Sequence, residues 1–227
     1  MFGIPVLGVA HDVLLTLADA LAPLLGTGSV AGAVVVFTAC VRLALVPLGY
    51  AQARAEVARA RLAPEVRRLR AKHAKDPQRL GSELVALHRQ SGTSMFAGIL
   101  PALAGLPFLF LTYRLFSGDH DLLEHTLAGA PLGLHPMTGL GGAHTPVLVG
   151  LLALIAGVAY LQHRAASAVP DAPAFVRWMP FGTVLTAAVV PLAAGLYLLT
   201  STAWTTAERP LLRRLATRRA DRVVPGH

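Results

Sequence analysis

Four long apolar stretches recur along the chain, at approximately residues 28–50, 96–116, 146–163 and 174–207. A helix needs about 20 mostly apolar residues to cross the ~30 Å hydrocarbon core of a bilayer. Each of the first three stretches therefore fits one span, whereas the last, which is interrupted by Pro191, fits two short ones. The pattern predicts an all-α polytopic membrane protein with five transmembrane helices.

Polar segments separate the predicted spans and complete the organisation of the chain. The predicted segments are an outer amphipathic helix and turn (1–29), transmembrane helices at 30–50, 96–116, 146–163, 176–191 and 192–207, a cytoplasmic helical hairpin (51–95), an extracytoplasmic loop (117–145), a cytoplasmic loop (164–175) and a basic cytoplasmic tail (208–227). Within the hairpin, Asp76 and Pro77 are typical of the N-cap and first residue of a second helix. The last two spans are short, so they require local thinning of the bilayer or burial among neighbouring helices.

Composition and charge place the chain in a membrane and predict its orientation. Hydrophobic residues make up 54% of the 227 residues and charged residues only 14%, against about 25% in soluble domains. Residues 51–95 carry ten Lys or Arg and four acids, and 208–227 carry six and two. The segments 1–29 and 117–145 contain acids but no Lys or Arg. Because basic loops stay in the cytoplasm, the N-terminus is predicted outside and the C-terminus inside, and the net charge of +8 does not indicate nucleic-acid binding.

Residues 4–25 allow two interpretations. Leucines and valines approximate one helical face, while Asp12 and Asp19 interrupt the apolar run. This pattern favours an amphipathic helix at the outer membrane surface. The alternative is a sixth span or an uncleaved anchor, which conflicts with the charge pattern of the loops.

One full charge, Arg42, lies inside the first predicted span. Insertion scales assign a cost of about 2.5–3.5 kcal/mol to a charge at the centre of a membrane helix, so such a residue is a functional candidate. Arg42 is about 12 Å of helix from Tyr50 at the predicted cytoplasmic end. Thr38, four residues earlier, shares its face, and Pro47 is expected to bend the helix. The alternative is a long side chain that only snorkels to the interface.

A polar and aromatic stripe runs along the last predicted span. Its members recur at spacings that keep them on one helix face; they are Tyr197, Ser201, Trp204, Thr205 and Glu208. On an otherwise apolar helix, such a stripe indicates either a polar site or hydrogen bonding between helices beside an interfacial tryptophan.

Motifs of enzymes and metal sites are absent from the sequence. Cys40 is the only cysteine, which excludes an intramolecular disulfide and a cysteine metal cluster. The histidines of the predicted outer loop do not have the spacing of metal ligands, and no P-loop, GxSxG or HExxH motif occurs. We therefore expect no catalytic residues, no metal, no cofactor and no enzymatic activity.

Six segments, taken in order, resemble the YidC/Oxa/Alb family of membrane protein insertases. They are TACVRLALVPL (38–48), LAPEVRRLRAKHAKDPQRL (62–80), SGTSMFAGILPALAGLPFLFLTYRLF (91–116), APLGLHP (130–136), YLQHRAA (160–166) and MPFGTVLTAAVVPLAAGLYLLTSTAW (179–204). The resemblance covers about residues 30–210 and rests on this arrangement more than on any one motif. The chain departs from the family pattern at Thr93, Ser94, Gly105 and Leu198, which is typical of a divergent bacterial paralogue.

This resemblance implies both a fold and a function. Five helices would enclose a hydrophilic groove that opens to the cytoplasm and to lipid. The chain would act as an insertase and chaperone that helps newly made membrane proteins to insert and fold in the bacterial plasma membrane. Its key arginine would be Arg42, and the implied groove residues are Arg42, Thr38, Gln162, Tyr197, Ser201, Trp204 and Thr205.

The implied partners are nascent membrane proteins and the lipid bilayer. The charged hairpin would recruit substrates, and the ribosome and the Sec translocon are further candidate partners, whereas specific nucleic-acid binding is not expected. The basic tail fits either a ribosome contact or an anchor on lipid headgroups. The alternative functions are a membrane scaffold without insertase activity, which predicts that Arg42 is dispensable, and a small transporter, which usually has acids inside its spans.

Overall fold

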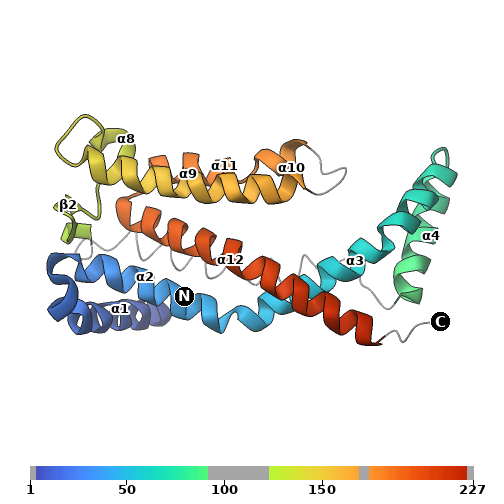
Figure 1. Cartoon of the computed structure of the whole chain (residues 1–227), viewed down its shortest axis with the longest axis horizontal. Coiled ribbons are helices and arrows are strands. Elements are labelled where there is room, and N and C mark those ends of the chain that lie inside the picture. The colour runs from blue at the N-terminus through green and yellow to red at the C-terminus, as the bar shows by residue number, and fades with distance from the viewer. Residues whose placement is uncertain (1–3, 92–122, 169–173, 224–227) are drawn as a thin grey trace. The chain divides into compact units, whose positions relative to one another are not determined.

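The computed structural model describes residues 4–91, 123–168 and 174–223, and its long elements are all helices (Figure 1). The all-α class predicted from the sequence is confirmed. The predicted second span at 96–116, with the family departures that precede and interrupt it, lies outside the described residues.

The described chain divides into two compact units. The first unit comprises residues 4–44, 123–168 and 174–207, and the second comprises 45–91 and 208–223. Each unit has an apolar core of its own.

Two paired helices, α1 (Ile4–Leu25) and α2 (Ser29–Ala44), begin the first unit (Figure 1). They are joined by the short 3-10 helix η1 (Gly26–Gly28), and Gly26 has φ +53°, a conformation that glycine adopts without steric cost. The stretch Gly8–Ala44 is long and apolar enough to cross a membrane. The structure thus packs residues 4–25 along the first predicted span, unlike a helix that lies alone on the membrane surface.

The helix expected over residues 30–50 is divided at Leu45. α2 ends at Ala44, and α3 (Val46–Lys72) begins immediately afterwards, so the prediction of one continuous helix is wrong here. Pro47 lies in the first turn of α3. Its nitrogen carries no hydrogen and cannot continue the bonding ladder of the preceding helix, whereas the first turn of a new helix tolerates proline.

The remaining elements of the first unit follow the undescribed segment. They are β1 (Thr126–Leu127), β2 (Ala130–Pro131), α8 (Pro136–Gly139), α9 (Thr145–Ser167), α10 (Ala174–Trp178), α11 (Phe181–Val189) and α12 (Leu192–Val223), of which the last continues into the second unit. β1 and β2 form an antiparallel hairpin.

The loop between β2 and α8 covers the start of α12. The backbone N–H groups of Leu192 and Ala193 donate to the carbonyls of Leu134 and Leu132, at 3.0 and 2.9 Å. The first N–H groups of a helix have no acceptor inside that helix, so these loop carbonyls replace a side-chain cap. The Leu132 side chain is fully buried beneath them.

α9 is apolar on its buried and its exposed faces. Leu148, Leu151 and Ile155 lie in the core, while Leu154 and Leu161 are exposed. A helix that is apolar on all sides belongs inside a large core or a membrane, and α9 is long and apolar enough to cross one. This agrees with the third predicted span.

The region of the fourth predicted span, 176–191, is broken into α10 and α11. Met179 and Pro180 form a turn between them. The imidazole Nδ1 of His163 on α9 lies 2.8 Å from the carbonyl of Arg177 and therefore donates to it. The same ring stacks near Trp178, with centroids 4.9 Å apart, which fixes α10 against the end of α9.

α12 is one helix through and beyond the fifth predicted span. The apolar pattern predicts a span at 192–207 and a separate tail at 208–227, whereas the helix continues without a break to Val223. Pro210 lies inside it. The described part of the predicted tail is therefore helical, and it packs against α3 in the second unit.

The second unit is built on α3, α4 (Pro77–Gln90) and the end of α12. The predicted N-cap of α4 is present, because the carboxylate of Asp76 accepts a hydrogen bond from the backbone N–H of Arg79 at 3.0 Å. The core of this unit lies between α3 and α12. α4 contributes no buried residue to it.

Candidate substrate-contacting site

The guanidinium of Arg42 reaches from α2 to α12 inside the first unit. Its Nη2 donates a hydrogen bond to the hydroxyl oxygen of Ser201, and the two residues lie 159 positions apart in the sequence. Arg42 is half-buried, and Ser201 is only 4% exposed. The structure therefore brings together two of the residues that the sequence predicts for one site.

Polar side chains are rare in the core around this contact. Among the fully buried residues of the described ranges, only Thr38 and Ser201 have polar side chains. The hydroxyl of Thr38 donates to the carbonyl of Val34 in its own helix, at 2.7 Å, so its burial costs little. Both hydroxyls occur on the helices that Arg42 joins.

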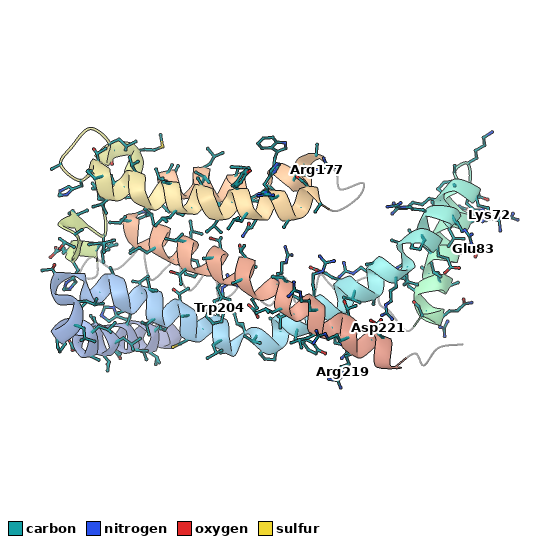
Figure 2. The ribbon with its side chains drawn as sticks, viewed as in Figure 1. Lys72, Glu83, Arg177, Trp204, Arg219 and Asp221 are labelled. Atoms are coloured by element: carbon teal, nitrogen blue, oxygen red, sulfur yellow. The ribbon has the colours of Figure 1, made fainter. Side chains whose placement is uncertain are left out.

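The predicted stripe on α12 is partly buried along the length described. Thr205 donates its hydroxyl proton to the carbonyl of Ser201 at 2.9 Å, and Tyr197 is half-buried against the core. The indole nitrogen of Trp204, drawn in Figure 2, is buried and has no hydrogen-bond partner within the described part of the chain. A buried N–H group of this kind is uncommon and is usually satisfied by some acceptor.

Gln162 of α9 contacts α12 on a neighbouring face. Its amide nitrogen lies 2.8 Å from the hydroxyl of Thr206 and 3.4 Å from the carbonyl of Thr202. The hydrogen bonds of Gln162 within the described residues are to Thr202 and Thr206, and none is to Ser201 or Thr205. Thr202 and Thr206 therefore join the polar surface of α12.

Sequence reasoning missed Thr202 and Thr206, although a signal for them exists. Five of the seven residues from Thr200 to Thr206 carry hydroxyls, so these groups occupy more than one face of the helix. The hydroxyls of Thr202 and Thr206 each donate to a carbonyl one turn earlier, at 2.6 and 2.7 Å. The hydroxyl oxygen of Thr206 stays able to accept from a neighbouring helix, and Gln162 donates to it. At Thr202, Gln162 approaches the backbone carbonyl instead.

The described residues of the site offer hydrogen bonding and positive charge, and no group arranged for covalent chemistry. Within the described ranges, no three His, Cys, Asp or Glu residues lie close enough to hold a metal ion. Leu198, one of the departures from the family pattern, packs half-buried against the core of the first unit.

Comparison with known families identifies the group to which this chain belongs. The profile of the family described as "60Kd inner membrane protein" matches residues 21–219. The chain belongs to the YidC/Oxa/Alb family. The match spans both described units, so it includes the helices that carry Arg42 and Ser201 as well as those of the second unit.

Curated relatives carry the name "Membrane protein insertase YidC". The protein of Pelagibacter ubique is 27% identical over 179 residues, which cover 72% of this chain and 31% of that protein. The protein of Acidiphilium cryptum is 28% identical over 185 residues, covering 75% and 31%. The protein of Clostridium perfringens is 32% identical over 85 residues, covering 37% and 36%. The aligned parts therefore span about a third of the length of each of these relatives.

Proposed function

We propose that this chain is a membrane protein insertase and chaperone that uses Arg42 to draw polar segments of newly made membrane proteins partway across the bilayer. The observation that carries the proposal is the contact of Arg42 with Ser201, which is one of only two polar side chains among the buried residues that the structure describes. Membership of a family with relatives named insertase supports it.

The contact suggests how Arg42 is held before a client arrives. A guanidinium has five N–H donors, and a serine oxygen is a neutral acceptor. A carboxylate accepts more strongly from arginine, often through two parallel bonds. An acidic or polar client segment would therefore displace Ser201 and pair with Arg42, and Ser201 would recover the arginine when the client leaves.

The driving force would come from the client itself. A polar segment that crosses ~30 Å of hydrocarbon leaves backbone groups unsatisfied, each at several kcal/mol. A hydrophilic groove that opens to the cytoplasm and to lipid shortens this dry path. Burying the apolar helix of the client in lipid contributes about 25 cal/mol per Å², so the activity would need no nucleotide and would break no covalent bond.

The proposed setting is a bacterial plasma membrane with the C-terminus in the cytoplasm. The excess of basic residues in 51–95 and 208–227 supports this orientation, and the ribosome and the Sec translocon are proposed cytoplasmic and membrane partners. Because α1 packs along α2, the outer position of the N-terminus needs its own test. A cysteine at exposed Gly8 in a Cys40→Ser background reacts with an impermeant thiol reagent from outside only if the N-terminus lies there.

The first test is complementation of cells depleted of their insertase. We expect the wild-type chain to restore insertion of a short client with an acidic outer tail. We expect Arg42→Ala to lose most of this activity, Arg42→Glu to lose more because it repels the acidic tail, and Arg42→Lys to retain part of it. Arg59→Ala, which removes an exposed arginine from α3, is the matched control and should behave as wild type.

The outcomes separate function from mechanism. Failure of the wild-type chain to rescue would contradict the insertase proposal. Equal rescue by all Arg42 variants would retain the function and reject the arginine mechanism. Photocrosslinkers placed singly at Val46 and at Ser201 test client contact in each unit separately, because a stalled nascent chain should crosslink at any position that lies on its path.

A double-mutant cycle tests the contact between Arg42 and Ser201 itself. Arg42→Ala and Ser201→Ala should each lower thermal stability in detergent, and the double variant should be more stable than the sum of the two losses predicts. The expected coupling is about 0.5–3 kcal/mol, as for residues in direct contact. Additive losses would show that the two side chains do not interact.

A further inference from the structure

The end of α12 is docked along α3 in the second unit. A Cβ atom added to Gly49 would lie 3.0 Å from Oε1 of Glu208 and 3.1 Å from Cδ1 of Leu212, so the glycine allows the two helices to approach closely. Ala53, Val57, Leu212 and Ala216 then form the apolar core between them. The sequence therefore encodes a helix pair where a free basic tail is expected.

Most acidic residues of the docked pair contact the neighbouring helix, whereas its arginines are exposed to the surroundings. Glu56 on α3 accepts from Arg209 on α12 at 3.3 Å, and Asp221 on α12 accepts from Arg61 on α3. The residue numbers of the contacting partners increase in the same direction along both helices, so the two helices run parallel. Oε1 of Glu208 is buried. Three of the four acids in α3 and residues 208–221 are thus turned toward the neighbouring helix.

The face of α12 that points away from α3 carries both leucines and arginines. Leu211 and Leu215 are 58% and 53% exposed, and Arg214 and Arg218 are exposed beside them. At 100° per residue these four side chains fall within an arc of roughly 100°. We name Leu211, Arg214, Leu215 and Arg218 the outer strip.

We propose that the outer strip is an interfacial anchor that lies on anionic lipid headgroups of the membrane. Apolar side chains next to arginines on one exposed face are typical of helices that insert leucines at the acyl boundary and pair their cations with phosphate. An RNA-binding face uses the cations and gains little from two exposed leucines. This inference goes beyond the proposed function and does not need Arg42, although it uses the proposed orientation.

The outer strip follows the fifth predicted span closely in the sequence. That span ends at Ala207, and Leu211 lies four residues later on the same helix, α12. Basic residues that follow a span on its cytoplasmic side are attracted to anionic lipid headgroups. In the second unit, α3 covers the face of α12 that carries Leu212 and Ala216, and the outer strip is left exposed.

The experiment measures which lipids lie at Leu215. The full-length chain, with p-benzoylphenylalanine at position 215, is reconstituted in vesicles of phosphatidylcholine with a minority of phosphatidylglycerol and is irradiated. Mass spectrometry then counts the lipid adducts. We expect the ratio of anionic to neutral adducts to exceed the ratio in the bilayer roughly fivefold, the factor that one arginine at an anionic surface supplies. High salt should reduce this ratio.

Two kinds of variant distinguish an effect of the outer strip on lipid enrichment from an effect of net charge. Arg214→Gln with Arg218→Gln should abolish the enrichment, whereas Arg54→Gln with Arg213→Gln removes equal charge from other exposed positions and should preserve it. Gly49→Leu keeps every charge but forces the helices apart at Glu208 and Leu212. It should also abolish the enrichment.

Three results obtained with lipid vesicles alone would overturn the inference. They are the absence of lipid adducts, adducts in the bulk lipid ratio, and equal loss in the two arginine double variants. A shift of the adducts from lipid to RNA when ribosomes are added would likewise overturn it in favour of a ribosome contact. Complementation by the same variants is scored separately, so failure of the lipid anchor is distinguishable from failure of the insertase proposal.

Discussion

Each of the two units of this protein is stabilised internally by a different kind of interaction. The first has a continuous apolar core in which Thr38 and Ser201 are the buried polar side chains among the described residues, and many of its exposed side chains are also apolar. The second has a small core between two arginine-rich helices, with ion pairs at its margins. One chain thus combines a part suited to lipid with a part suited to a charged aqueous boundary.

The difference concerns where each unit obtains its stability. Close packing of apolar side chains dominates in the first unit, and because this packing involves no charges it is not subject to charge screening by salt. In the second unit, exposed ion pairs contribute little each and are screened by salt, so its few buried side chains carry most of the free energy of docking. Substitutions that remove one kind of interaction at a time test this comparison.

The largest effect is expected for Leu148→Ala on α9. Leu148 is fully buried, and the cavity left by such a change typically costs about 2–5 kcal/mol. Thermal unfolding in detergent, followed by far-UV circular dichroism, measures the loss. Leu154→Ala on the same helix is the matched control, because Leu154 is 60% exposed and its truncation should cost less than about 1 kcal/mol. Equal losses at the two positions would contradict the packing described for α9.

An intermediate and local effect is expected for Leu212→Ala. It removes the largest α12 side chain from the small core of the second unit, so the end of α12 should detach more often without unfolding the first unit. Trypsin, which cleaves after arginine, should then release the end of α12 several times faster. Thr217→Ala shortens an exposed side chain of the same helix outside the outer strip and should leave the rate unchanged. The same rate in both variants would show that α12 is not docked through Leu212.

The smallest effect is expected for Glu56→Gln. Its ion pair with Arg209 is exposed, so removing it should cost about 0.2–1 kcal/mol at low salt and less at high salt. Glu65→Gln removes an exposed acid elsewhere on α3 and serves as the control. The measurement is the salt dependence of the trypsin rate at α12. A loss that does not change with salt would show that Glu56 acts through packing instead of charge.

The sequence predicts those features that local patterns determine. The apolar run at 146–163 lies within α9, and Asp76 caps α4 as its position before a proline indicates. The family resemblance implies that Arg42 and Ser201 belong to one groove, and the structure shows a hydrogen bond between their side chains. What that contact does for a client is the subject of the proposed tests.

Features that depend on distant parts of the chain cannot be predicted from local patterns. The sequence near Glu208 does not indicate that α12 continues, because the residues that pack against this part of α12 are on α3. The close packing of the two helices also depends on Gly49, which has no side chain. The N–H groups at the start of α12 are likewise satisfied by loop carbonyls at Leu132 and Leu134. The sequence identifies Gln162 as a polar residue at a helix end. That it donates a hydrogen bond to Thr206, and not to Ser201, depends on how α9 packs on α12.

The distance in sequence between Arg42 and Ser201 has a consequence for biosynthesis. The two residues are separated by 159 positions, and translation adds about 5–20 residues per second. Arg42 is therefore made roughly 8–30 seconds before its serine exists. During that interval the cation must be hydrated, screened by headgroups or attended by another protein, so a newly made copy of this chain has the same need for help that we propose it meets in others.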